Sequence, residues 1–126
     1  MQLLIDTHVL LWSLGNNPRL TPRWRSVLVD PAVHVIVSTV SVWEISLKKS
    51  LGKLQAPEDL REVLAENDFQ VLPVTLDHAL AFRHLPWHHR DPFDRMLVAQ
   101  ACTEKFTLLS SDSSLQNYEG LDLVIL

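Results

Sequence analysis

Short apolar runs alternate with longer segments of helical periodicity along the whole chain, and this alternation restricts the fold more than any other feature. Five runs rich in Val, Ile, Leu and Phe are predicted strands, over residues 2–5, 34–38, 69–73, 106–109 and 121–125. Helices are predicted over residues 9–14, 22–29, 40–51, 57–66, 76–84 and 92–105. Because strands that alternate with helices form parallel sheets covered on both faces, we expect an α/β fold: a three-layer sandwich around a five-stranded parallel sheet.

The composition narrows the class of protein. A chain of 126 residues, 47% of them apolar, can bury a core of its own, so we expect a single domain over residues 1–126. No apolar run reaches the ~18 residues of a bilayer span, and the first residues lack a signal peptide's basic leader. Cys102 is the only cysteine, which excludes an internal disulfide and a cysteine-based zinc site. We therefore expect a cytoplasmic protein with no membrane contact.

The charge balance bears on nucleic-acid binding. A formal net charge of −4 argues against a binder that relies on a simple basic patch. It does not exclude a nucleic-acid enzyme, because acids that hold metal ions make the balance more negative. The chain has three glycines and neither G-x-G-x-x-G nor G-x-x-x-x-G-K-[ST], so dinucleotide and P-loop sites are excluded.

Two acids in the first half of the chain follow predicted strands. Asp6 comes directly after the first strand, where capping the next helix and binding a ligand are equally supported. Glu44 lies inside a predicted helix on an apolar stripe, where an acid is costly unless it is compensated. A capping box with Ser41 or an ion pair with Lys48 would explain Glu44 structurally. Its place on the stripe favours a functional role.

The stretch "HHRDPFDRM" contains two aspartates with different predicted roles. Asp91 followed by Pro92 is a strong N-cap followed by proline at the first helical position, so we interpret Asp91 as structural. Asp94 lies one turn further, in a helix that is apolar nearly all round, and therefore points toward packed structure. The alternative is that Asp94 only complements the helix dipole. We favour a functional Asp94.

Asp112, in "LLSSDSSL", is weak evidence alone, because Ser/Asp clusters are usually turns or caps. The four acids taken together are stronger evidence for a site than any one of them. Asp6, Glu44 and Asp112 follow strand ends and Asp94 opens the helix before the fourth strand, so all four converge on the ligand-binding edge of a parallel sheet. Gathered carboxylates repel one another unless protons or a cation lie among them. Oxygen ligands without cysteine spacing predict a hard ion, Mg²⁺ or Mn²⁺.

At these residues the sequence resembles the PIN-domain nucleases, and among them the VapC-type toxin ribonucleases of type II toxin–antitoxin systems. The resemblance covers essentially the whole chain. It is carried by "LLIDTHVLLW" with Asp6, "VSVWEISLKKSLGKL" with Glu44, "RDPFDRMLVAQA" with Asp94 and "LLSSD" with Asp112. It implies a PIN-like sandwich, hydrolysis of RNA supported by one or two divalent ions at these catalytic and metal-binding acids, a small antitoxin partner and a homodimer. The fourth acid varies in role in such nucleases, so Asp112 is the least defined.

Polar residues near the acids receive supporting roles. Thr7 and Ser110 are expected to orient carboxylates through hydrogen bonds, with a cap or turn hydroxyl as the alternative. Lys48, Arg90 and Arg95 are expected to contact RNA phosphates, with solvated surface charge as the alternative.

Histidine and tryptophan residues receive no catalytic role. His88 and His89 adjoin the acids, but neither is needed as a base if water is activated by a metal. Trp12 and Trp43 are expected in the core.

Three further functional hypotheses stand beside the toxin. A housekeeping RNA-processing nuclease would lack a small antitoxin-like reading frame beside its gene. A phosphatase of the haloacid dehalogenase kind shares the strand-end aspartate, but it needs a second acid two residues on, where His8 stands. A non-catalytic binding module, whose acids only cap helices, would neither bind Mn²⁺ tightly nor cleave RNA.

Overall fold

A computed structural model describes residues 1–126 and contains a sheet of five parallel strands, as expected. The strands are β1 (Gln2–Ile5), β2 (His34–Ser38), β3 (Gln70–Leu72), β4 (Thr107–Ser110) and β5 (Leu123–Ile125). The helices are α1 (Thr7–Leu14), α2 (Pro22–Val29), α3 (Thr39–Ser50), α4 (Leu60–Glu66), α5 (Leu76–Arg83) and α6 (Pro92–Glu104), with a 3₁₀ turn η1 (Ser113–Asn117). Every predicted element is present, and its ends differ from the prediction by up to three residues.

The order of the strands places the functional edge of the sheet. The order is β3-β2-β1-β4-β5: β2 and β3 lie on one side of the central strand β1, and β4 and β5 lie on its other side. Ile5 of β1 pairs with Val37 of β2 and with Leu109 of β4. The crevice where the strand order reverses, outside the carboxyl ends of β1 and β4, is the usual ligand site of such sheets.

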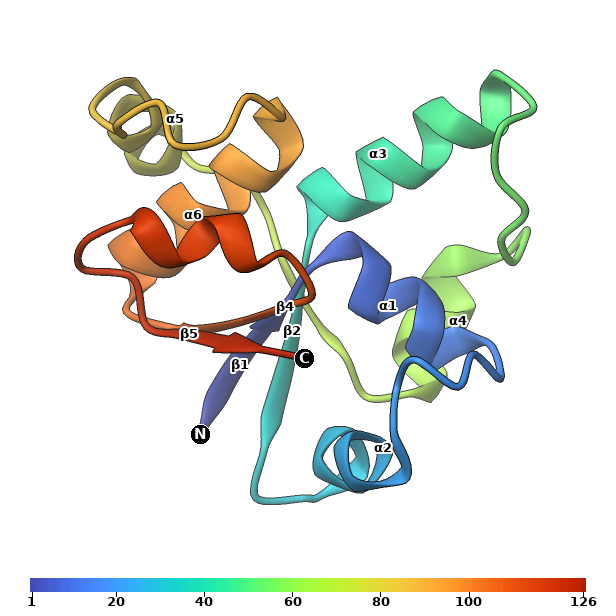
Figure 1. The fold of residues 1–126 in the computed structure, drawn as a ribbon. Coiled ribbons are helices and arrows are strands. Elements are labelled where there is room, and N and C mark those ends of the chain that lie inside the picture. Colours follow the sequence, from blue (N-terminus) through green and yellow to red (C-terminus); the bar gives the residue numbers. More distant parts are fainter.

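Two apolar cores lie on opposite faces of the sheet and make the fold a three-layer sandwich (Figure 1). Alternate strand residues point to opposite faces, so Leu3 and Ile5 of β1 pack with α1, α2 and α4, whereas Leu4 packs with α6 and η1. These strand residues are fully buried, which explains why the strands read as continuous apolar runs. The fold class is confirmed.

Side-chain caps begin several helices where the sequence predicts them. Thr21 caps α2 ahead of Pro22, and Asp91 caps α6 ahead of Pro92. Ser38, at the end of β2, caps α3 by accepting a hydrogen bond from the Val40 amide. This early start makes Glu44 an interior residue of α3 and excludes a capping box with Ser41. None of the helices combines the length and the apolar character needed to cross a membrane.

Candidate active site

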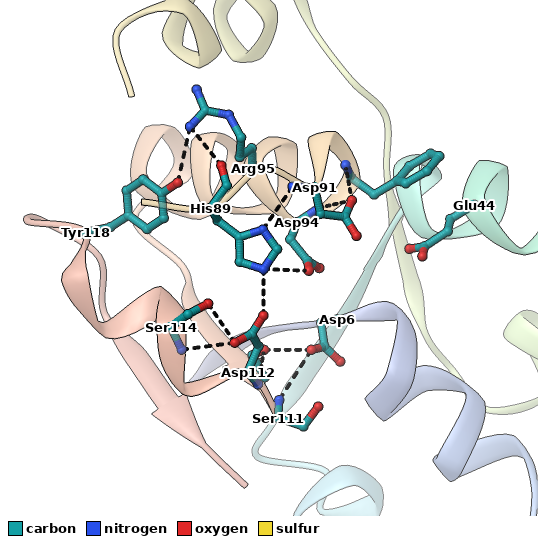
Figure 2. Close-up of polar contacts among 12 residues, drawn as sticks. Asp6, Glu44, His89, Asp91, Asp94, Arg95, Ser111, Asp112, Ser114 and Tyr118 are labelled. Carbon is teal, nitrogen blue, oxygen red and sulfur yellow. Dashed lines mark hydrogen bonds and ion pairs between the residues drawn. The ribbon is translucent and has the colours of Figure 1, made fainter. Parts of the chain in front are cut away.

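The predicted acids come together at the edge of the sheet beyond β1 and β4. Asp6 follows β1 and Asp112 follows β4, while Glu44 comes from α3 and Asp94 from the first turn of α6 (Figure 2). The carboxylates of Asp6, Glu44 and Asp94 point toward a common space, with that of Asp91 beside them (Figure 2). Segments separated by more than one hundred residues are therefore joined at one site.

Asp6 is held by hydrogen bonds on both carboxylate oxygens. One oxygen accepts from the Val9 amide at 2.8 Å and so caps α1, and the other accepts from the Ser110 hydroxyl at 2.7 Å and the Ser111 amide at 3.3 Å. Burial raises the pKa of Asp6 above its ordinary value, and these hydrogen bonds oppose the rise. The two interpretations of Asp6 are compatible, since one carboxylate both caps a helix and faces the site.

Glu44 is buried, with 4% of its surface exposed, and its carboxylate pairs with the ammonium of Lys48 at 2.6 Å. The pair joins residues one turn apart on α3. Hydrogen bonding to Glu44 raises the pKa of Lys48, although burial of the lysine opposes it. Lys48 thus supplies the compensating charge that a buried Glu44 requires. It also makes Lys48 a competitor for any cation that Glu44 binds.

Asp91 caps α6, as predicted, and Asp94 makes different contacts. An oxygen of Asp91 accepts hydrogen bonds from the amides of Phe93 at 2.8 Å and Asp94 at 3.5 Å, which caps α6. Asp94 accepts no close hydrogen bond; the nearest nitrogen of a basic side chain is His89 Nε2, at 3.6 Å. Burial, together with the charges of Asp91, Asp6 and Glu44, raises the pKa of Asp94 to about 7, against the opposing effect of His89.

Asp112 is more exposed and fully hydrogen-bonded. One oxygen accepts from the amide and the hydroxyl of Ser114, at 2.9 and 2.7 Å, which caps η1. The other lies 2.6 Å from His89 Nε2. Burial raises the pKa of Asp112, but the hydrogen bonds from Ser114 and His89 outweigh it, so the pKa lies below its usual value.

The residues present fit a divalent cation. Asp94 titrates near neutrality because it is buried among other carboxylates, so this space lacks the positive charge needed to ionise all of them. Potential ligand atoms of His89, Asp94 and Asp112 also lie within 4.8 Å of one another. Asp94 belongs to both groupings and is the centre of the site. Carboxylate oxygens are the donors that Mg²⁺ and Mn²⁺ prefer.

Two of the supporting predictions are wrong. Thr7 donates its hydroxyl to Ser41 at 3.0 Å and hydrogen-bonds to no carboxylate, whereas Ser110 does donate to Asp6, as expected. Arg95 is 1% exposed, so its guanidinium does not reach an RNA phosphate. It turns inward because α6 is covered on this side by the segment before it, whose carbonyls accept its hydrogen bonds. Arg90 is exposed, as a phosphate contact requires.

Sequence reasoning missed His89. Its Nδ1 accepts a hydrogen bond from the Asp91 amide at 3.0 Å. This contact is local, since a polar side chain often bonds to the backbone two residues further on, and the sequence could have suggested it. Its other nitrogen contacts Asp112, which is distant in the sequence, and no local signal indicates that contact.

Solved structures share this fold. The VapBC2 complex from Rickettsia felis bound to a promoter DNA fragment contains a chain 13% identical, with a TM-score of 0.77, covering 100% of this chain and 99% of that one. The DNA-bound VapBC of Salmonella typhimurium matches at 13% identity and a TM-score of 0.69, over 99% and 98%. FitAcB from Neisseria gonorrhoeae matches at 21% identity and a TM-score of 0.62, over 98% and 96%. At these identities the likeness establishes the fold alone.

Family comparison adds to this likeness. Among curated protein sequences, none matches this chain. The family model of the PIN domain, in contrast, matches residues 3–121, which include all four predicted acids. Because this match covers nearly the whole chain, the chain belongs to the PIN domain family of nucleases.

Proposed function

We propose that this protein is a Mg²⁺- or Mn²⁺-dependent endoribonuclease that acts as the toxin of a toxin–antitoxin pair. The observation that carries the proposal is the buried carboxylate cluster around Asp94, whose pKa of about 7 reflects crowding by Asp6, Asp91 and Glu44 after burial. Caps and ion pairs alone do not require several acids to point into one space. The whole of residues 1–126 forms the catalytic domain.

The chemistry is hydrolysis of a phosphodiester bond. A divalent ion held by Asp6, Glu44 and Asp94, with Asp112 beside them, would polarise the phosphate and lower the pKa of water. The chain prepares these ligands in advance: Val9, Ser110 and Ser111 hold the Asp6 carboxylate in one orientation. Burial of Asp6 and Glu44 keeps competing water away from their oxygens.

Contacts to the RNA backbone come from basic side chains at the rim. Arg90 is exposed beside the cap of α6, and Lys48, with 42% of its side chain exposed, extends from α3 next to Glu44. Both can meet phosphates that approach the acids. A metal ion that binds Glu44 would release the Lys48 ammonium for such a contact.

The toxin assignment rests on likeness to complexes. Two of the similar structures are described as VapBC complexes, and a third is described as a toxin–antitoxin complex from Klebsiella pneumoniae. We infer a small antitoxin that covers the acidic edge of the sheet, and action in the cytoplasm on cellular RNA. A housekeeping RNA-processing nuclease is the alternative. A small reading frame abutting the gene, whose product suppresses the toxicity of this chain, distinguishes the two.

We also propose a homodimer, for which an exposed apolar face provides the surface. Trp43 was expected in the core, but it is 62% exposed, because it lies on the outer side of α3. With Val74, Phe82 and Met96 it lines an apolar groove between α3, α5 and α6. Light scattering should give a mass of twice 14.4 kDa, and Trp43→Asp should halve it. A monomeric wild-type chain would contradict the dimer.

The proposed activity is tested with a matched pair of variants, Asp94→Asn and Asp91→Asn. Asp94→Asn removes a ligand at the centre of the site, so we expect loss of Mn²⁺ binding by calorimetry and a fall in RNA cleavage of roughly a thousandfold. Asp91→Asn keeps the cap of α6, because Asn caps about as well as Asp, and should retain both properties.

Circular dichroism establishes that both variants are folded, and EDTA should abolish cleavage by the wild type. Full cleavage by Asp94→Asn overturns the nuclease assignment. Equal losses in both variants overturn the division between the capping and the functional aspartate.

A further inference from the structure

His89 occupies an unusual position for a residue that the proposed chemistry does not require. Its ring lies between the cap of α6 and the end of β4, with Nδ1 3.0 Å from the Asp91 amide nitrogen and Nε2 2.6 Å from an oxygen of Asp112 (Figure 2). The same Nε2 is 3.6 Å from an oxygen of Asp94. One imidazole thus spans three aspartates of the site.

The hydrogen bonds determine which ring nitrogen bears the proton. A neutral imidazole has one donor and one acceptor, and Nδ1 must be the acceptor because a backbone amide points at it. The hydrogen is therefore on Nε2 and is donated to Asp112. A metal ligand would need a lone pair on Nε2 instead. His89 therefore acts as a hydrogen-bond donor to a carboxylate and not as a metal ligand, although its ring nitrogen lies within 4.8 Å of oxygens of Asp94 and Asp112.

Asp112 depends on this contact for its place in the site. Its other oxygen accepts hydrogen bonds only from Ser114, two residues away in the same turn. These local bonds do not hold Asp112 at any particular distance from α6. The hydrogen bond from His89 is the one that ties Asp112 to the segment carrying Asp94. Without it, only Ser114 would hold this carboxylate, which is about one third exposed, and no hydrogen bond would keep it near Asp94.

Arg95 fixes the segment that carries His89. Its Nη1 donates to the Pro86 carbonyl at 2.8 Å, to the His89 carbonyl at 3.5 Å and to the Tyr118 hydroxyl at 3.2 Å. The guanidinium also lies 3.7 Å from the centroid of the Trp87 ring. Because Arg95 directly follows Asp94, a single turn of α6 carries the central acid and also fixes the segment that contains His89.

We propose that His89 is a positioning residue, which holds Asp112 against Asp94 through its Nε2–H group so that the two carboxylates act at one metal site. This rests on the proposed function insofar as those carboxylates bind the metal. Residues that orient ligand groups in this way typically change metal affinity by about 10–100-fold when removed.

Two substitutions separate positioning of Asp112 from support of the loop. The amide of His89→Gln reaches about as far as Nε2 and can still donate to Asp112. His89→Asn is shorter: its oxygen can accept from the Asp91 amide in place of Nδ1, but it cannot reach Asp112. His84→Asn, at an exposed histidine outside the site, is the control for substitution itself.

We expect His89→Asn to bind Mn²⁺ at least tenfold more weakly in calorimetry and to cleave RNA correspondingly slowly, with an unchanged melting temperature. His89→Gln and His84→Asn should stay within about threefold of the wild type. In the metal-free wild type, ¹⁵N–¹H correlation spectra of the ring should show the hydrogen on Nε2.

Wild-type Mn²⁺ affinity in His89→Asn, a loss in His89→Gln as large as in His89→Asn, or a ring protonated on Nδ1 overturns the positioning role. Failure of the wild type itself to bind Mn²⁺ or cleave RNA instead overturns the proposed function, and the ring spectra still report the hydrogen bond to Asp112.

Discussion

The helices α1 and α6 pack on opposite faces of the sheet, and their first turns supply acids to the same site in different ways. At α1 a single aspartate does both tasks: Asp6 caps the helix with one oxygen and is held for the site by Ser110 and Ser111 through the other. At α6 the tasks are divided, because Asp91 caps the helix and Asp94, one turn on, faces the site with no close hydrogen bond.

This difference shows how hydrogen bonding controls the charge of a buried acid. The bonds to Asp6 oppose the effect of its burial, whereas Asp94 has only His89 to oppose burial and three neighbouring carboxylates. The pKa of both acids is raised, but the hydrogen bonds to Asp6 offset part of the effect of burial, whereas Asp94 lacks such bonds and its pKa reaches about 7. Asp94 is therefore the acid whose negative charge the protein compensates least. A divided helix start leaves one carboxylate under-compensated, which suits a binding site.

The largest effect is expected when the free energy of unfolding of Asp94→Asn is compared with that of the wild type as a function of pH. The native pKa of Asp94 is about 7 and its ordinary value is 3.8, so the native state retains a proton that the unfolded chain has lost. The wild-type free energy of unfolding should therefore fall between about pH 4 and about pH 7. Asp94→Asn lacks the titrating group, so its free energy of unfolding should not show this fall. Above pH 7, without metal, Asp94→Asn should be the more stable protein by on the order of 2 to 4 kcal/mol.

Urea unfolding in EDTA at pH 4.5 and pH 8 measures this difference, and the two proteins should converge at the lower pH. Saturating Mn²⁺ should reverse the order at pH 8, because only the wild type gains stability from the ion. A stability difference that is the same at both pH values would show that Asp94 is not the under-compensated acid.

A smaller effect is expected at Asp91, where the matched variants are Asp91→Ala and Asp91→Asn. Both remove the negative charge beside Asp94, but only Asn keeps an acceptor for the amides of Phe93 and Asp94. Asp91→Ala should be less stable than Asp91→Asn by about 1 kcal/mol in urea unfolding at pH 8. Equal stabilities would mean that α6 begins without its cap and that the division of tasks there is wrong.

Much of the fold could be predicted because its signals are local. Short apolar runs such as Leu3–Ile5 are typical of buried strands between helical layers, and Asp91 with Pro92 is a strong local signal for the start of a helix. The four acids could be predicted to converge because the carboxyl ends of parallel strands share one edge. For the same reason Ser110, at the end of β4, could be expected to reach a carboxylate.

The amino-acid sequence by itself thus determined the sheet, the helix starts and the edge at which the acids meet, since periodicity, capping and strand direction act over a few residues. Only the tertiary structure decided which neighbours those residues have. It turned Arg95 inward onto Trp87, left Trp43 on the surface and brought His89 to Asp112. Such contacts depend on how separate elements pack, and a side chain carries no local signal of the partner it meets across the fold.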